Sequence, residues 1–308
     1  MNIGILRHEK IGYAENELVK IGRERGHNMR IIHPHVANIR IEDRPEVDAV
    51  ISRAEINTFG NSITDAYFRV LNFYESWNIP IINGSRATLN AQDKFRTHVL
   101  VARAGLNTPK TIIGYGSEEI KKNIEAWTFP YVIKKPYGSR GEGVLFAHDR
   151  EDLEEISDRF SEDEPFLIQE YIPLERNEEG NFRDMRLWVC RNSITERPEF
   201  LGGMYRNSTN GDFRTNISVG GKSEYMKEFP EDVSYMAEKS LDAIDADVAG
   251  IDIARSQEGE VYLIEINISF DSRIEIQSEI GISIEENILD LAEHRTEIQC
   301  TTNHIHSM

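Results

Sequence analysis

Short apolar runs alternate with amphipathic stretches in the first third of the chain. An apolar run at residues 2–6, a helix-like stretch over Glu15–Arg25 that ends at Gly26, and a run at residues 29–33 form a β–α–β beginning. Runs at residues 48–52 and 79–83, with a helix between them, continue the alternation. This order predicts a parallel sheet with helices on its faces, and no GxGxxG motif marks a dinucleotide site after the first run.

The middle of the chain has a different pattern. We expect a helix over Leu89–Ala104, ended by Gly105, and a strand at residues 110–115. Residues 129–148, "FPYVIKKPYGSRGEGVLFAH", place two β-like runs around a glycine-rich connector with no helical period after it. This pattern predicts a flexible β-hairpin flap. A charged helix at residues 150–160 and a strand at residues 165–172 complete the unit.

The last part of the chain returns to strand patterns. In "FRDMRLWVCR", residues 182–191, alternation places Asp184 and Arg186 on one face and Leu187 on the other. A helix over Asp232–Ala246 precedes two apolar runs, residues 248–254 and 260–269, which Gly259 joins as a hairpin. The final thirteen residues are polar and predict a frayed tail. We therefore expect units at residues 1–87, 88–168 and 169–295, followed by a flexible tail at 296–308.

Composition narrows the class of protein. The chain has 308 residues, 39% of them apolar and 29% charged, as in a soluble globular protein. It lacks the 18 to 20 consecutive apolar residues of a membrane helix, and its N-terminus does not resemble a signal peptide, so we expect a cytoplasmic protein. Two cysteines exclude a disulfide framework and a cysteine-rich zinc site. The net charge of −18 argues against nucleic-acid and membrane partners, so an anionic ligand needs a local basic pocket.

Three oxygen-bearing side chains lie in the predicted C-terminal hairpin. Asp252 is in the first run, and Glu265 and Asn267 are two residues apart in the second, so these two share a face. Mg²⁺ binds through a few carboxylates, with phosphate oxygens and water completing its shell. The sequence therefore predicts a divalent-cation site. The alternative is that Glu265 and Asn267 face solvent on an edge strand.

Two lysines and the glycine-rich flap are suited to a triphosphate. Lys134 ends an apolar run, and Lys94 opens a helix. Glycine lets backbone N–H groups approach phosphates closely. The flap contributes Gly138, Ser139, Gly141 and Gly143. On its own this loop is a weak signal, but a downstream cation site strengthens it.

The run "LIQEYIP" after the flap fits an extended edge whose backbone could hydrogen-bond adenine. Gln169 and Glu170 offer polar side chains there, and Tyr171 and Ile172 follow. Taken by itself, the run would be interpreted as a buried strand.

Three arginines in successive elements, Arg186, Arg206 and Arg214, are candidates for stabilising charge during transfer. Their alternative interpretation is surface salt bridges in an acidic protein. We assign no role to the histidines, which show no metal-binding spacing: His8, His33, His35 and His98.

Taken together, these motifs resemble those of the ATP-grasp superfamily, and within it the RimK-like glutamate ligases. The likeness rests on Lys94, "VIKKPYGSRGEGV", "LIQEYI", "DMR", "DFRTN", "GIDI" and "IEIN" in this order. It implies an ATP-grasp fold, with an N-terminal Rossmann-like domain, a central subdomain with the flap and a C-terminal subdomain with the metal site. It also implies ATP, two Mg²⁺ or Mn²⁺ ions, and amide-bond formation.

The resemblance assigns roles to residues. It implies phosphate contacts for Lys94 and Lys134, and adenine contacts for Glu170 and Tyr171. It places Asp184, Arg214 and Asn216 along the nucleotide, and Asp252, Glu265 and Asn267 at the metal.

Two segments depart from the family pattern, and both border the expected substrate entrance. Phe270 and Asp271 stand where members usually have Pro-Gly, and the connection over residues 171–184 is longer and more acidic than usual. Substrate identity is therefore less constrained than nucleotide chemistry.

We expect an ATP-dependent carboxylate–amine ligase that acts through an acylphosphate, adding glutamate to a small carboxylate-bearing acceptor. The partners would be that acceptor and an amino acid, and the chain would form a homo-oligomer, a dimer or a tetramer. Three alternatives are open: ligation to a protein or carrier-protein terminus, kinase-like phosphoryl transfer, and ATP binding without turnover.

Overall fold

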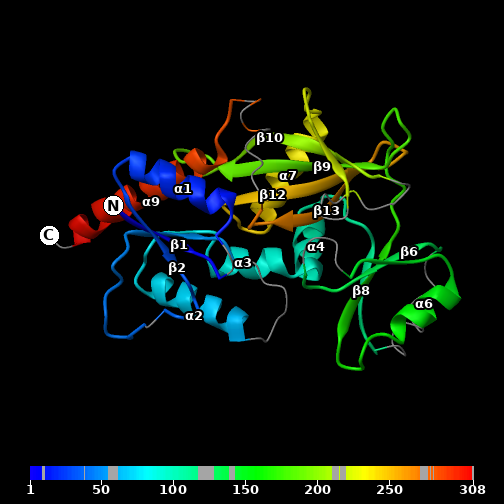
Figure 1. Ribbon diagram of the computed structural model, residues 1–308, viewed down its shortest axis with the longest axis horizontal. Coiled ribbons are helices and arrows are strands. Elements are labelled where there is room, and N and C mark those ends of the chain that lie inside the picture. The colour runs from blue at the N-terminus through cyan, green and yellow to red at the C-terminus, as the bar shows by residue number, and fades with distance from the viewer. Residues whose placement is uncertain are drawn as a thin grey trace.

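We describe a computed structural model of the chain. It describes residues 1–8, 11–37, 39–54, 62–116, 128–138, 143–209, 215, 220–270, 277, 279 and 281–306. In Figure 1 three sheets follow one another along the chain, and both termini lie at the same end of the molecule.

The first sheet is parallel, as the sequence predicts. Its strands are β1 (Asn2–Leu6), β2 (Asn28–Ile32), β3 (Ala49–Ser52) and β4 (Ile81–Ile82), in the order β2-β1-β3-β4. Helix α1 (Tyr13–Glu24) packs on one face and α2 (Ser62–Ser76) on the other, because alternate strand residues point to opposite faces.

The second sheet is antiparallel and carries the flap. It contains β5 (Thr111–Tyr115), β6 (Tyr131–Lys134), β7 (Leu145–Ala147) and β8 (Pro165–Glu170), in the order β5-β8-β6-β7. Helix α6 (Arg150–Ser157) packs on it through Leu153 and Ile156. The predicted hairpin is confirmed, because β6 pairs antiparallel with β7.

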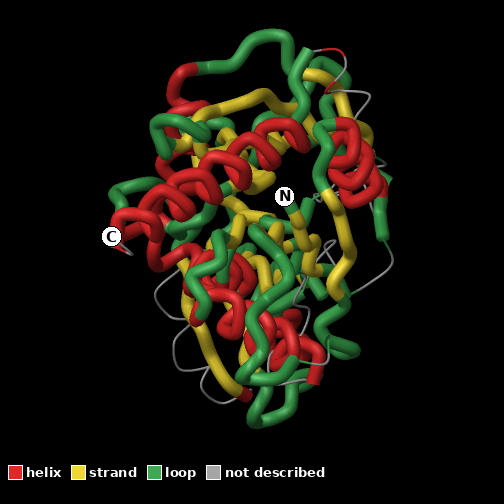
Figure 2. Tube along the Cα trace, turned by 90° about the vertical axis from the view of Figure 1, so that its left-hand side faces the viewer, coloured by secondary structure: helices red, strands yellow, loops and turns green. Residues whose placement is uncertain are grey.

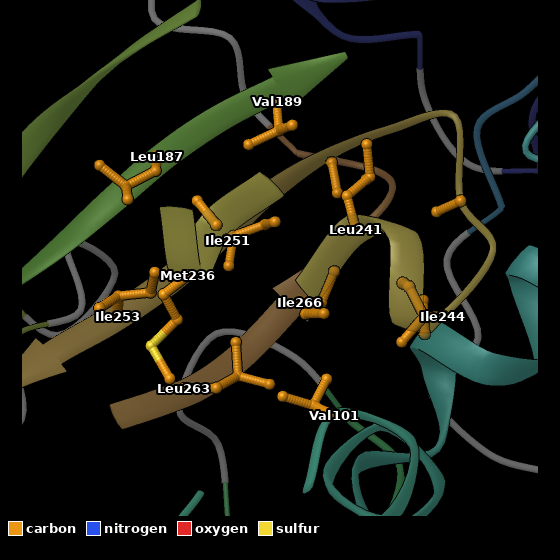
Figure 3. Close-up of a cluster of buried hydrophobic side chains, with 14 of the residues drawn as sticks. Val101, Leu187, Val189, Met236, Leu241, Ile244, Ile251, Ile253, Leu263 and Ile266 are labelled. Carbon is orange, nitrogen blue, oxygen red and sulfur yellow. The ribbon is translucent and has the colours of Figure 1, made fainter. Parts of the chain in front are cut away.

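The third sheet positions the candidate site. Its order is β11-β10-β9-β12-β13, all antiparallel, from β9 (Arg183–Arg191), β10 (Pro198–Asn207), β11 (Lys222–Tyr225), β12 (Val248–Arg255) and β13 (Val261–Asn267). Helix α7 (Glu231–Ala243) covers one face. Figure 3 shows the core beneath it, where side chains of β9, β12 and β13 meet α7 and Val101.

The other face of this sheet has two regions, one that packs on neighbouring elements and one that carries the candidate active site. One end of it packs on the N-terminal sheet, α1 and the long helix α9 (Ile284–His306), which crosses this side of the molecule (Figure 2). Asn83 ties the two sheets together, since its side chain donates to the Val248 carbonyl at 2.8 Å and accepts from the Asp247 amide at 2.8 Å. The remaining end carries the candidate active site.

Two helix predictions are wrong in detail. The helix expected over Leu89–Ala104 is two helices, α3 (Ser85–Gln92) and α4 (Lys94–Arg103). The break is at Asp93, whose extended backbone lets its carboxylate cap α4 by accepting from the amides of Phe95 and Arg96.

The predicted frayed tail is instead helical to His306, as the last part of α9. The hydroxyl of buried Thr296 donates to the Ala292 carbonyl at 2.8 Å, so polar residues that suggested a loose end continue the helix. The boundaries of the three expected units stay predictions.

Candidate active site

Charged side chains gather on one face of the third sheet because of strand alternation. Asp184 and Arg186 point away from the Leu187 core, and Arg206 of β10 lies opposite Asp184. On the other side of β9, Asp252 of β12 lies opposite Arg186. Four charged residues from three adjacent strands therefore meet.

These residues form a chain of buried ion pairs. Arg186 donates to both carboxylate oxygens of Asp252, at 2.7 and 2.8 Å. Arg206 donates in the same forked way to Asp184, and its Nη1 lies 3.0 Å from Asp252 Oδ2. Such forked, charge-assisted contacts are the strongest hydrogen bonds proteins make. The surface-salt-bridge interpretation is wrong for Arg206, whose side chain is 4% exposed.

The pairing changes the protonation behaviour of both partners. Burial alone would raise the pKa of Asp252, but Arg186 and Arg206 outweigh it and lower this pKa below its ordinary value. Burial would lower the pKa of Arg206, but Asp184 and Asp252 outweigh it and raise that pKa. Asp252 and Arg206 are therefore both charged at neutral pH.

Glu265 extends the row to β13. The hairpin predicted from the sequence places it opposite Asp252, and Asn267 lies opposite Gly250. Lys94 Nζ lies 3.0 Å from Glu265 Oε1 and also donates to the Gly138 carbonyl at the base of the flap. One ammonium group thus connects the flap to the carboxylate row.

Lys134 lies close by and is buried. Burial lowers its pKa to about 8, although Glu265 acts in the opposite direction. A lysine with this pKa is mostly charged at neutral pH and is poised to meet an anion.

The oxygen donors of the hairpin fit a hard divalent cation. Asp252 and Glu265 supply carboxylates and Asn267 an amide, on one face of paired strands. Among the described residues, the buried amide nitrogen of Asn267 has no hydrogen-bond partner. Within that part of the chain, no three His, Cys, Asp or Glu side chains are grouped so that they could hold a metal ion.

A cavity brings most of the predicted nucleotide residues together. The predicted residues that line it are Lys94, Lys134, Gly138, Gln169, Glu170, Tyr171, Ile172, Asp184, Arg206, Asp252 and Glu265. Arg186, Gly143 and Asn267 are not on its lining, although Arg186 contacts Asp252 and Gly143 precedes the lining residue Val144. Ser139, Gly141, Arg214 and Asn216 lie outside the described residues. The roles of all these residues stay predictions.

The expectation that the run "LIQEYIP" lies at an edge of its sheet is wrong, and its adenine contacts stay a prediction. Strand β8 is internal, paired with β5 and β6 up to Glu170, so its backbone is already used. Tyr171, Ile172 and Leu174 follow the last pair and line the cavity. The Glu170 carboxylate accepts from the Lys110 amide at 2.9 Å, which holds its side chain at the start of β5.

Sequence reasoning missed two residues that organise the cavity. Asp93, besides capping α4, accepts from the Tyr137 hydroxyl at 3.0 Å, and the sequence "QDKF" could have revealed the cap. His98 is buried between the lysines and Gln169, whose amide nitrogen is 3.3 Å from His98 Nε2. Burial and the two lysines hold the pKa of His98 well below its ordinary value, so it is neutral. No sequence signal marks it.

Comparison with known proteins places this geometry in a family. The sequence profile of the RimK-like ATP-grasp domain matches residues 91–292. A protein of Alkalilimnicola ehrlichii named "Probable alpha-L-glutamate ligase" is 33% identical over 282 residues, which cover 87% of this chain and 88% of that protein. The chain belongs to the RimK-like ATP-grasp family. A Haemophilus influenzae protein of the same name is 27% identical and covers 95% of this chain and 97% of its own length.

Solved structures share the fold of this chain. A RimK domain ATP-grasp protein from Sphaerobacter thermophilus superposes with a TM-score of 0.69 at 16% identity, covering 96% of this chain and 98% of that one. The D-alanine–D-alanine ligase of Bacillus anthracis gives 0.67 at 16% identity, covering 98% and 99%. The predicted family, fold class and enzyme class, a ligase that forms carbon–nitrogen bonds, are confirmed. Within the described residues, no helix has the length and hydropathy needed to cross a bilayer.

The departure at Phe270 has a structural explanation in this RimK-like chain. Phe270 is buried, and its ring packs so closely over Gly250 that a Cβ there would lie 3.1 Å from the ring. Its carbonyl accepts from Arg53 at 2.6 Å. The residue therefore joins the N-terminal unit to the third sheet and does not line the cavity. Asp271 lies outside the described residues.

Proposed function

We propose that this chain joins glutamate, as the amine, to the carboxylate of a small acceptor, with ATP bound in the cavity described above. The observation that carries the proposal is the convergence of Lys94 and Lys134 with Asp252 and Glu265 on a single cavity. Cations for phosphates and carboxylates for a divalent ion are the parts that phosphoryl transfer requires.

Each residue has a defined task in the proposed reaction. Lys94 and Lys134 bind the phosphates, and the backbone of Tyr171 and Ile172 holds the base. The flap around Gly138 covers the phosphates and excludes water, which prevents hydrolysis of a reactive intermediate. Asp252, Glu265 and Asn267 would hold Mg²⁺ or Mn²⁺, two ions in all, which supply charge neutralisation when bound.

The acceptor carboxylate is proposed to take the γ-phosphoryl group of ATP. The resulting acylphosphate carries a good leaving group, so the amine of glutamate displaces phosphate and forms the amide. Positioning and charge stabilisation account for such a reaction without a covalent protein nucleophile. Arg206, which two carboxylates already hold, is proposed to position them and not to contact the substrate.

A small acceptor is favoured over a protein by the charge of the chain. With a net charge of −18, the chain repels an acidic protein at long range, and this repulsion weakens with salt. A small anion carries less charge and is repelled less, and the lining of the cavity that it would enter includes Lys94 and Lys134.

Phosphate release tests the proposal. The purified chain, MgATP and a panel of small acids would be assayed with and without glutamate, and we expect release that requires both an acid and the amine. Hydroxylamine in place of glutamate should give a hydroxamate, whereas a stable phosphorylated acid would indicate a kinase instead. Nucleotide binding without release would indicate a regulatory ATP-binding protein.

A second experiment tests acceptor size. Labelled glutamate and MgATP would be incubated with either the small-molecule extract or the protein fraction of cells, at moderate salt. We expect the label in the small-molecule fraction. Label found mainly on protein would contradict the small-acceptor proposal and leave the ligase chemistry intact.

A further inference from the structure

We infer that Arg186 is a counter-ion placeholder, which neutralises Asp252 while the cation site is empty and releases it when a divalent cation binds. The inference rests on the proposed function, because it treats Asp252 as a ligand of that cation. It assigns Arg186 a positioning role that acts through Asp252.

The carboxylates of the site are each paired with a cation of the chain itself. Asp252 is held by Arg186, and its side chain is 1% exposed. Asp184 is held by Arg206, and Glu265 has Lys94 3.0 Å away. Isolated buried carboxylates would be costly, so each has its own cation within hydrogen-bond distance. A cation that uses Asp252 must therefore replace a contact that already exists.

The two arginines around Asp252 differ in how firmly they are held. Arg206 is 4% exposed and binds two carboxylates on two strands, so losing one leaves the other. Arg186 is 17% exposed, and among the described residues its guanidinium bonds to Asp252 alone. Arg186 occupies both oxygens of Asp252, whereas Arg206 contacts only Oδ2. Arg186 is therefore the group that has to leave and the one with fewer contacts to lose.

The exchange of Arg186 for a cation couples the binding of the cation to the binding of the nucleotide. A doubly charged ion is the largest local charge in such a site and repels a neighbouring guanidinium. The released Arg186 needs a new anion, and the phosphates of the nucleotide provide one. Cation and nucleotide should therefore bind cooperatively, each weakly without the other.

The inference is tested by Mn²⁺ binding without nucleotide, because it predicts that replacing Arg186 strengthens this binding. Free Mn²⁺ would be followed by electron paramagnetic resonance during titration of the wild type and of Arg186→Gln. Because a competing charge-assisted contact is removed, we expect Arg186→Gln to bind Mn²⁺ about tenfold more tightly than the wild type. Arg186→Lys keeps the charge and loses the fork, so it should fall between the two. A residue with only a structural role would leave Mn²⁺ affinity unchanged or weaken it.

The matched control is Arg183→Gln. It removes the same charge from the same strand, but on the other face, where Arg183 pairs with Glu175 at 2.8 Å. Its Mn²⁺ affinity should stay within about twofold of wild type, because salt screens a charge without direct contact. The inference would be overturned if Arg186→Gln unfolds at the same temperature as the wild type and binds Mn²⁺ no more tightly than the wild type. If that variant does not fold, wild-type affinity in Arg186→Lys would overturn it.

One further arm separates this inference from the proposed function. Wild-type protein with a non-hydrolysable ATP analogue should bind Mn²⁺ more tightly than protein alone. Absence of Mn²⁺ binding even with the analogue would overturn the metal site and with it the placeholder. Tight binding with the analogue, together with unchanged affinity in Arg186→Gln, would remove only the placeholder.

Discussion

The two ends of one sheet face in this protein have opposite characters, although the same strands build both. At one end Arg186 of β9 pairs with Asp252 of β12, and four residues along β9 Cys190 pairs with Val248. The second end is covered by α9 and the N-terminal sheet and is apolar. The first end borders the cavity and is charged. What covers a strand thus decides which side chains it can carry.

The two ends also depend on different forces. The apolar end is held by burial and close packing, which have no direction and tolerate similar shapes. The charged end is held by directed ion pairs, in which removal of one partner leaves a buried charge. Substitutions at the two ends should therefore have separable effects, on chemistry at one and on stability at the other.

The largest effect is expected from Glu265→Gln at the charged end. Loss of this carboxylate should lower ligase turnover about a thousandfold or more, because the charge that holds a divalent ion is removed. The measurement is steady-state phosphate release. Glu258→Gln, at an exposed position in the turn of the same hairpin, should keep wild-type rates. Full activity of Glu265→Gln at saturating Mg²⁺ would remove the ion site from this residue.

At the apolar end, Leu289→Ala in α9 should lower the free energy of unfolding. Leu289 is fully buried in the core shared with Trp188 and Val248, and such truncations cost about 2–5 kcal/mol. Urea denaturation measures this loss. The KM for ATP should stay unchanged below the unfolding transition; a changed KM with unchanged stability would show that the two ends are not separable.

A smaller effect concerns pH at the charged end. Because the pKa of Lys134 is about 8, this lysine loses its proton as pH rises through 8. A phosphate favours the charged form, so nucleotide affinity should fall about tenfold per pH unit above that value. Calorimetric titration of an ATP analogue between pH 7 and 9.5 measures it. Lys134→Arg should show no such inflection, because a guanidinium stays charged; an inflection in both proteins would assign it to another group.

The smallest effect is expected at the flap. Backbone amides in residues 137–143 should exchange hydrogen more slowly when ATP is bound, because glycine-rich backbone approaches the phosphates. Mass spectrometry of deuterium uptake measures it, with β9 as the internal reference. Identical uptake with and without saturating ATP would leave the segment as an ordinary surface hairpin.

The sequence predicted local features of the site better than its long-range pairing. Alternation along β13 placed Glu265 and Asn267 on one face and the turn at Gly259 predicted the hairpin, because both signals are local. The register shift between Asp252 and Ile253, which sets Glu265 opposite Asp252, was not predicted. The Arg186–Asp252 pair joins residues 66 positions apart, and its formation depends on the register of β9 and β12. Register is set by the whole sheet, so the sequence showed which arginines were candidates and not which carboxylate each one holds.

The fold was predictable because the apolar periodicity of each element is local. The two errors in the helix predictions each have an identifiable cause. Apolar periodicity marked the three sheets, whereas the break at Asp93 depended on a single cap. The polar end of α9 follows a buried stretch that includes Leu289 and Ala292, and this packing continues the helix. Tertiary contacts of this kind leave no mark in the residues that they order.

The central claim is that this cavity activates a carboxylate as an acylphosphate, and oxygen transfer tests it most directly. Once phosphate release has identified an acid, that acid would be labelled with ¹⁸O in its carboxylate and turned over with MgATP and glutamate. The account predicts that one ¹⁸O atom per turnover appears in the released phosphate, because the carboxylate oxygen attacks the γ-phosphorus and leaves with it. Phosphate free of ¹⁸O, with amide formed at the normal rate, would contradict the account.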